Sequence, residues 1–194
     1  MSSPAVSLRR VSAAGVEPLL AIMEACGASM VSRLGLRHWD PPLSILELRA
    51  YASEREVWAI HSSPDGALVG GVITGPSSTA PYVSPAMFRA PDALALYISK
   101  LAIDPTLQGA GLGAAAPAAL EALARERGLA ALRLDALRAV PNLPRLYARA
   151  GYTVVATASA ADAHGVTHEL DIWERVLREA PPRPAAAGAP LEPA

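Results

Sequence analysis

The sequence of 194 residues has one lysine, one cysteine and few aromatic residues. The cysteine, Cys26, cannot form an internal disulfide, and no apolar run reaches the about 20 residues that a membrane-spanning helix needs. The formal net charge of −1 provides no general attraction to nucleic acid or to an anionic membrane. These absences predict a cytoplasmic protein that binds neither nucleic acid nor a membrane. Local geometry must therefore hold any anion that it binds.

The positions of lysine and histidine in the sequence argue against a Walker loop and against a metal site. A Walker loop ends in Gly-Lys-Ser/Thr, and no lysine follows Lys100. The four histidines have no metal-ligand spacing. His164 and His168 are four residues apart, but the intervening Gly165 favours a loop before the last strand. The sequence predicts no metal site.

The composition, 52% hydrophobic and 18% charged, predicts a single domain with a large core. We assign residues 1–178 to this domain. The segment that follows is rich in Pro and Ala, and we expect residues 179–194 to be disordered.

Apolar residues recur at strand and helix spacing along most of the chain. The expected strands cover residues 6–11, 56–61, 68–74, 96–103, 131–137, 152–156 and 169–176. The expected helices cover residues 16–23, 44–51, 111–128 and 141–151. Ser44 and Glu47 form a capping box, and Pro-Asp-Gly at 64–66 predicts a hairpin turn. This order predicts an α/β fold with a mixed central sheet of about seven strands and flanking helices.

The segment 75–93, here called the flap, is too long for a simple connection between two strands. It is rich in Pro, Ser and Ala, and Met87 and Phe88 are its large apolar residues. We expect a mobile flap or an interaction loop. Met87 and Phe88 are candidates for a self-association surface, which leaves a homodimer open.

A glycine-rich turn follows the expected strand at 96–103. Asp104-Pro105 leads into Gln108-Gly109-Ala110-Gly111-Leu112-Gly113, which opens the expected helix. Glycines permit positive φ angles and close approach of the backbone, and free N–H groups at a helix start bind anions. The turn therefore predicts a nucleotide-like ligand with a pyrophosphate group.

Two other interpretations of this turn are open. The glycines could reflect composition alone and only connect two elements. Alternatively, Gly109-x-Gly111-x-x-Ala114 fits a dinucleotide-binding fingerprint, with Asp135 as a ribose ligand. The five residues 104–108, which separate the strand from the first glycine, argue against the second interpretation. Too little chain also follows Asp135 to complete such a fold.

Three segments together resemble the GNAT superfamily of acyl-coenzyme A-dependent N-acyltransferases. The first runs from Tyr97 to Pro105 and into Gln108-x-x-Gly111-x-Gly113, the second is Leu132-Arg133-Leu134-Asp135, and the third is Leu146-Tyr147-x-x-x-Gly151-Tyr152. The resemblance is specific from about residue 96 to residue 155. Upstream it is looser, where Trp39 and the hairpin at 57–71 are similar to the acceptor-side half of such enzymes.

The resemblance implies acetyl-CoA as co-substrate, an amine as acceptor and no metal. Family members pair the pantetheine arm with backbone that matches Leu101, Ala102 and Ile103. They hold the pyrophosphate on amides that match Gln108, Gly109, Ala110, Gly111, Leu112 and Gly113. Tyr147 matches the tyrosine that protonates the leaving thiolate. A tyrosine of pKa about 10 is protonated at neutral pH and is able to give its proton to a thiolate whose pKa is about 8.5.

Several points stay open at this stage. Tyr147 also fits a core aromatic beside Leu146. Lys100 lies where the family often has a basic residue, but an outward strand position fits equally. The proton of the attacking ammonium needs a base, for which Asp40, Glu47 and Asp92 are candidates that also fit solvated side chains or caps. The acceptor is a small-molecule amine, an amino acid, an aminoglycoside or a protein N-terminus, and we expect the flap to help select it.

The sequence departs from the family pattern at two places. The family's coenzyme-contacting Asn falls on Val140, with Asn142 two residues late. Pro117 lies inside the expected 111–128 helix, where it removes a backbone donor and crowds the carbonyl of Gly113. These departures motivate an alternative, a non-catalytic sensor or subunit that binds acyl-CoA with the same fold.

Overall fold

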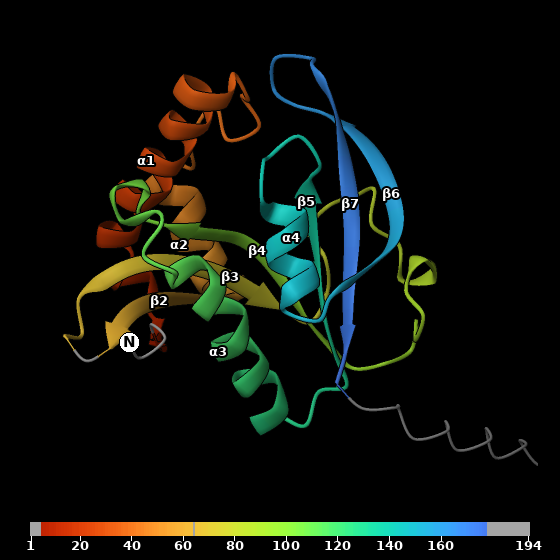
Figure 1. The fold of residues 1–194 in the computed structure, drawn as a ribbon. Helices are drawn as coiled ribbons and strands as arrows, with labels where there is room; N and C mark the ends of the chain where they lie inside the picture. Colours follow the sequence, from red (N-terminus) through yellow and green to blue (C-terminus); the bar gives the residue numbers. More distant parts are fainter. Residues whose placement is uncertain (1–4, 64, 178–194) are drawn as a thin grey trace, which may run out of the picture.

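Seven strands form one mixed sheet in the order β1-β2-β3-β4-β5-β7-β6 (Figure 1). The structure is a computed structural model that describes residues 5–63 and 65–177, so the predicted tail at 179–194 lies outside the described residues. β4 and β5 are parallel, and every other pair of neighbours is antiparallel. The predicted mixed sheet is confirmed. The strands are β1 (Ala5–Val11), β2 (Glu56–Ser63), β3 (Leu68–Gly75), β4 (Ala95–Ile103), β5 (Ala131–Leu137), β6 (Thr153–Ala161) and β7 (Thr167–Val176).

Four α-helices connect these strands. They are α1 (Glu17–Leu34), α2 (Ile45–Glu54), α3 (Leu112–Glu126) and α4 (Leu143–Arg149). The predicted capping box starts α2, where the Glu47 amide donates to the Ser44 hydroxyl at 3.2 Å and the Ser44 amide donates to the Glu47 carboxylate at 2.8 Å. The predicted start of α4 at Pro141 is wrong. Asn142 precedes the helix with φ +69°, and Pro144 lies in its first turn, where a proline costs no hydrogen bond.

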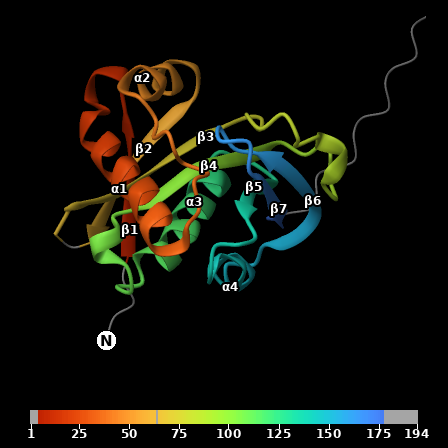
Figure 2. The same ribbon diagram turned by 90° about the horizontal axis from the view of Figure 1, so that it is seen from above.

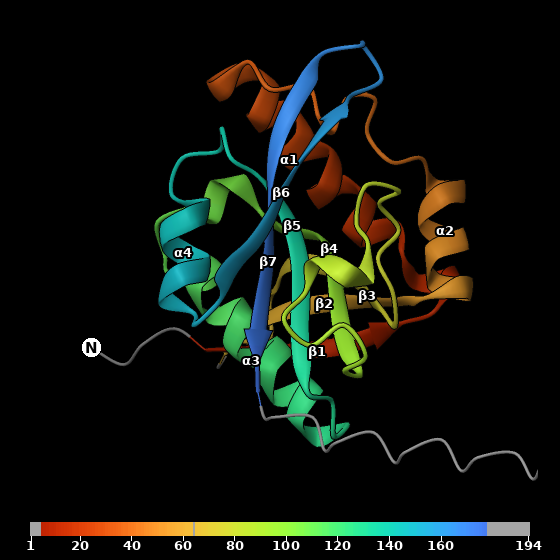
Figure 3. The ribbon, with the colours of Figure 1, turned by 90° about the vertical axis from the view of Figure 1, so that its right-hand side faces the viewer.

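The helices cover the two faces of the sheet in pairs, α1 and α2 on one face and α3 and α4 on the other (Figures 2 and 3). The alternation of side chains along each strand produces two cores. Ile73 and Ala102 pack with Leu19 and Leu48 from the α1 and α2 side. Ile98 packs with residues of α3 and α4 on the other side. No helix in the described part of the chain has the length and apolar character to cross a membrane.

The flap packs against the part of the sheet that β4, β5 and β7 form. Phe88 is 4% exposed and forms a small core with Ala95, Tyr97 and Ile172. Two hydrogen bonds hold the backbone that follows Phe88. The Arg89 amide donates to the Glu174 carboxylate at 3.0 Å, and the Ala90 carbonyl accepts from the Arg133 guanidinium. The prediction that Phe88 belongs to a self-association surface is therefore wrong. Phe88 attaches the flap to the sheet that the flap covers.

Candidate functional site

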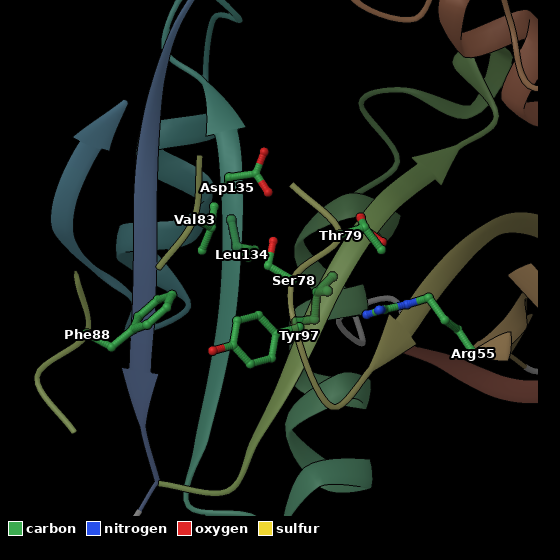
Figure 4. Close-up of a pocket in the computed structure, with 10 residues that line it drawn as sticks. Arg55, Ser78, Thr79, Val83, Phe88, Tyr97, Leu134 and Asp135 are labelled. Carbon is green, nitrogen blue, oxygen red and sulfur yellow. The ribbon is translucent and has the colours of Figure 1, made fainter. Parts of the chain in front are cut away.

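The sheet opens as a fork between β4 and β5. These strands pair only over residues 95–98 and 131–134, after which they separate (Figures 1 and 4). The cause lies in a bulge of β4, since Val72 of β3 faces two residues, Lys100 and Leu101. Lys100 has φ +52°, a value that few non-glycine residues adopt. Beyond Ile98 the backbone of β4 has no strand partner on the β5 side.

The predicted pantetheine-binding residues lie along this open edge. Leu101 and Ile103 are half-buried and pack towards the α3 core, whereas Ala102 is buried on the α1 side. The Ile103 carbonyl accepts from the Cys26 thiol at 3.2 Å. Burial raises the pKa of Cys26 to about 11, so this thiol stays protonated at neutral pH. The edge therefore exposes backbone groups, while its side chains belong to the two cores.

The glycine-rich turn lies at the end of β4 and leads into α3. Asp104 fixes its entry by accepting from the Thr106 amide at 2.9 Å and the Thr106 hydroxyl at 2.7 Å. Gly109 has φ +90° and Gly111 has φ +81°, both in the region that favours glycine. Gln108, Gly109, Ala110 and Gly111 are exposed, and Gly113 is half-buried. A turn with exposed amides at a helix start has the geometry of an anion site.

At the turn the structure adds to the sequence prediction in two respects. Leu112 is 7% exposed and packs in the α3 core, so only its backbone is available to a ligand. Arg33 of α1 donates to the Gln108 side chain at 2.7 Å and places a positive charge beside the turn. Sequence reasoning missed Arg33, because no local signal links residues 75 positions apart.

Tyr147 of α4 is 6% exposed and packs its ring against Tyr152 and Trp173, with centroid separations of 5.7 and 5.8 Å. Burial raises the pKa of Tyr147 to about 12, with a smaller contribution from the Asp135 carboxylate. Tyr152 differs in one respect, because its hydroxyl is enclosed without a hydrogen-bond partner in the described structure. Tyr147 is thus both a core aromatic and a buried, protonated hydroxyl near Asp135.

A pocket lies on the opposite face of the sheet, where the flap covers the start of the fork (Figure 4). Its lining includes Tyr97 and Ser99 of β4, Asp135 of β5, and Arg55, the residue that follows α2. The Tyr82 hydroxyl donates to the Asp135 carboxylate at 2.9 Å. Asp135 is the acidic residue of this lining, and the structure thus gives it a position unrelated to ribose binding.

Lys100 and His38 lie close to Asp135. The Lys100 ammonium stands 5.2 Å from the centroid of Trp39, so Lys100 packs on Trp39 instead of extending outward. Burial lowers the pKa of Lys100, against the opposing effect of Asp135 and Glu47. Burial also lowers the pKa of His38, and the positive charge of Lys100 lowers it further. His38 was not a sequence candidate, since a lone histidine in a loop carries no pattern.

The structure gives the three carboxylates considered from sequence positions other than the site. Glu47 caps α2, and Asp40 pairs with Arg37 at 2.8 Å and His164 at 3.1 Å. Asp92 is exposed and lies outside the lining of the pocket. Among the described acidic residues, Asp135 is therefore the carboxylate that lines the pocket at the fork.

The histidines and the departures from the family pattern also have definite places. His168 lies in β7, not in the predicted loop, and pairs with Asp162 at 2.8 Å. In the described part of the chain no cluster of His, Cys, Asp and Glu suits a metal ion. α3 continues from Leu112 to Glu126 with Pro117 buried inside it, so the proline does not end the helix. Asn142 is exposed, and its side chain does not cap α4.

The sequence model of the acetyltransferase (GNAT) family matches residues 31–152, more than half of the chain. The chain belongs to the GNAT family. This match includes the open edge of β4, the glycine-rich turn and α4. No curated protein matches the chain.

Solved structures show that the GNAT fold extends over nearly the whole chain. A protein from Salmonella typhimurium, described as an acetyltransferase and solved with its cofactor acetyl-CoA, has a TM-score of 0.62 at 20% identity and covers 91% of this chain and 96% of its own. A ribosomal-protein-alanine N-acetyltransferase from Brucella melitensis has a TM-score of 0.63 at 18% identity, covering 88% and 99%. A chimeric spermidine N-acetyltransferase from Vibrio cholerae has a TM-score of 0.64 at 14% identity, covering 90% and 96%. At these identities the likeness concerns the fold.

Proposed function

We propose that this GNAT protein transfers an acetyl group from acetyl-CoA to an amine by direct attack. The fork between β4 and β5 carries the proposal, because β4 leads from it to a glycine-rich turn with exposed backbone, and a buried tyrosine and a pocket with a carboxylate lie beside it. The GNAT family uses acetyl-CoA, and the similar proteins named above include enzymes that acetylate amines. The domain that does so comprises residues 1–178.

In this proposal the α3 side of the fork binds the coenzyme. The open backbone of Leu101, Ala102 and Ile103 receives the amide groups of the pantetheine arm, as an added strand would. The pyrophosphate is held by the backbone N–H groups of the turn formed by Gln108, Gly109, Ala110, Gly111, Leu112 and Gly113. Arg33 contributes positive charge near the same phosphates.

Replacing Gly109 with Ala tests the turn. A Cβ at Gly109 meets no atom within 4 Å, so the change acts through the φ of +90°. An L-residue loses about 1–2 kcal/mol there, and we expect the Kd for acetyl-CoA to rise about tenfold as the turn relaxes. Calorimetric titration measures this. Gly165→Ala is the matched control, with φ +77° and equal space in the turn between β6 and β7. Equal Kd values for both variants would contradict the assignment.

The chemistry needs protons to leave the amine nitrogen and one proton to reach the sulfur. The amine nitrogen forms a bond to the acetyl carbon, the carbon–sulfur bond breaks, and the sulfur leaves as a thiolate. Tyr147 gives the thiolate a proton. Burial raises the pKa of Tyr147 and so makes it a weaker acid than an exposed tyrosine. The same apolar surroundings raise the pKa of the thiol group that is formed beside it. The difference between the two pKa values therefore stays small enough for proton transfer. The ammonium loses one proton before attack, and its nitrogen loses a second one when the carbon–sulfur bond breaks; this second proton, passed through water, restores Tyr147.

We assign Asp135 as the base that removes a proton from the amine. Its carboxylate faces the pocket, and the Tyr82 hydroxyl fixes its orientation. We expect Asp135→Asn to lower kcat/KM at neutral pH about 100-fold, the lower end for a general base. The deficit should shrink as the pH approaches the pKa of the amine, about 10.4 for an alkylamine, because the free amine then needs no base.

A pH series of initial rates measures this dependence, with Asp92→Asn as a control at an exposed carboxylate. A deficit that is constant with pH would rule out proton removal by Asp135. Direct attack itself is tested by varying both substrates together. Intersecting double-reciprocal plots support a ternary complex, whereas parallel lines would demand an acetylated enzyme and contradict direct attack.

A further inference from the structure

β6 forms an open edge of the sheet. It pairs with β7 on one side, and in the described part of the chain no backbone hydrogen bond joins residues 153–161 to any other segment. Figure 3 looks onto this end of the sheet, where β6 stands in front of β7. A strand at an edge carries a row of unpaired N–H and C=O groups, and these groups can pair with another extended strand.

The composition of β6 leaves this edge unprotected. Soluble proteins usually protect an edge strand with charged residues, with proline or with a bulge. β6 has the sequence TVVATASAA, which contains neither charge nor proline. Its bulge lies near one end, between Val154 and Ala156, and residues 156–161 pair with β7 one to one. A regular, uncharged stretch is therefore open along its outer side.

The other edge of the sheet, β1, is built differently. Arg9 and Arg10 are adjacent in this strand, so they point to opposite faces of the sheet, and both are exposed. They place positive charge on both faces beside any strand that would pair with β1. Copies joined from β1 to β6 would also leave an open edge at each end and extend into a filament. Pairing of β6 with β6 instead closes after two copies.

The side chains of β6 are compatible with self-pairing. Any antiparallel pairing of residues 156–161 with the same stretch of a second copy brings Ala, Thr or Ser opposite Ala, Thr or Ser, so no like charges meet. Ala156, Ala158 and Met87 are half-buried against the small core around Phe88, and Val154 is 42% exposed. Apolar side chains that stay partly exposed beside an open edge favour a protein partner.

We infer that the chain forms a symmetric dimer in which the β6 strands of two copies pair antiparallel and join the two sheets. The two-fold axis is perpendicular to the sheet and passes through the middle of the paired stretch. β7 and β5 separate β6 from the open edge of β4, so the dimer leaves that edge free in each copy. The surface for self-association is thus β6, with Met87 of the flap beside it.

Sedimentation velocity tests the dimer, over about 1 to 100 μM protein, a range that brackets a micromolar Kd. We expect the wild-type protein to shift to twice the mass of one chain across this range. Thr157→Lys together with Ser159→Lys adds two charges at exposed positions of the edge. This variant should raise the dimer Kd at least about tenfold, because like charges then meet across the pair.

A matched control adds two lysines to the opposite edge. Ala5→Lys together with Ser7→Lys changes two exposed positions of β1 that have the same spacing. We expect the dimer Kd of this variant to stay within about twofold of the wild-type value, because β1 lies outside the proposed contact. Circular dichroism verifies that both lysine variants are folded.

Cross-linking tests the strand pairing itself. Opposite and diagonal residues of paired strands lie about 5–8 Å apart, within the span of a short bismaleimide. Cys26 is half-buried and its thiol stays protonated, so the wild-type protein provides the background reaction. We expect covalent dimers from Thr157→Cys, and no more than the background from Ser7→Cys.

Three results would overturn the inference. The first is a wild-type protein that is monomeric at every concentration. The second is a dimer that persists unchanged in the folded Thr157→Lys, Ser159→Lys variant, because the contact would then lie elsewhere. The third is equal cross-linking of Thr157→Cys and Ser7→Cys, and this comparison decides alone if the lysine variant fails to fold.

Discussion

Replacing Tyr147 with Phe is expected to lower kcat for acetyl transfer about 100-fold, the smaller effect typical of a lost general acid. The change removes one hydroxyl from a ring that remains packed against Tyr152 and Trp173. The Kd for acetyl-CoA should stay within about twofold, because the turn and the edge of β4 are untouched. Stopped assays of thiol release and calorimetry measure the two quantities.

Tyr152→Phe is the matched control. It removes a hydroxyl from the neighbouring ring, which is 3% exposed and lies 5.7 Å away between centroids. Because that hydroxyl is enclosed without a partner, its loss should not slow transfer and should not destabilise the fold. If Tyr147→Phe reduced kcat by less than about threefold, or no more than Tyr152→Phe, the role assigned to Tyr147 would be wrong.

The pH dependence gives a second readout of Tyr147. Its pKa is raised to about 12, so the hydroxyl keeps its proton throughout the range in which the protein is assayed. The acid is lost only as the pH rises through that value. The kcat profile of the wild-type protein should therefore have no descending limb up to about pH 10.

Replacing Glu174 with Gln is expected to destabilise the fold by about 3–5 kcal/mol, the cost of breaking a buried ion pair. Arg133 and Glu174 are each 1% exposed, and their side chains are 3.0 Å apart at Nε and Oε1. Arg133 also donates to the Tyr97 hydroxyl at 3.0 Å, and its guanidinium stands 4.2 Å from the centroid of Phe88. The variant would leave a buried guanidinium with a neutral partner.

Denaturant unfolding measures this change, with Glu17→Gln as the control. Glu17 pairs with Arg49 on the surface, where a lost ion pair has little effect. Replacing both members of the buried pair, as Arg133→Met with Glu174→Leu, should recover part of the stability but not the hydrogen bonds to the flap. Equal stability of wild type and Glu174→Gln would contradict the stabilising role assigned to this pair.

Most elements of the fold were predictable because their signals are local. The capping box at Ser44 and Glu47 and the glycines at 109 and 111 depend on neighbours within a few residues. Alternating apolar residues likewise marked the strands. The start of α4 was misplaced because two prolines, Pro141 and Pro144, each fit a first turn, and only the conformation of Asn142 decides between them.

The surroundings of Asp135 were not predictable in the same way. Asp135 lies in β5, Arg55 follows α2, and His38 lies between α1 and α2; each is unremarkable in its own stretch of sequence. Their proximity depends on the fork, which itself depends on the bulge at Lys100. Phe88 was misinterpreted for a related reason, since its burial results from strands more distant in the chain.

Acetyl transfer from acetyl-CoA to an amine is tested most directly by one assay. Purified protein is first titrated with acetyl-CoA by calorimetry, and free thiol is then followed with and without added amines. We predict micromolar binding at one site and thiol release that requires the amine and yields the acetylated acceptor. Binding without amine-dependent release would instead support a sensor or subunit, and would contradict the catalytic account of Tyr147 and Asp135.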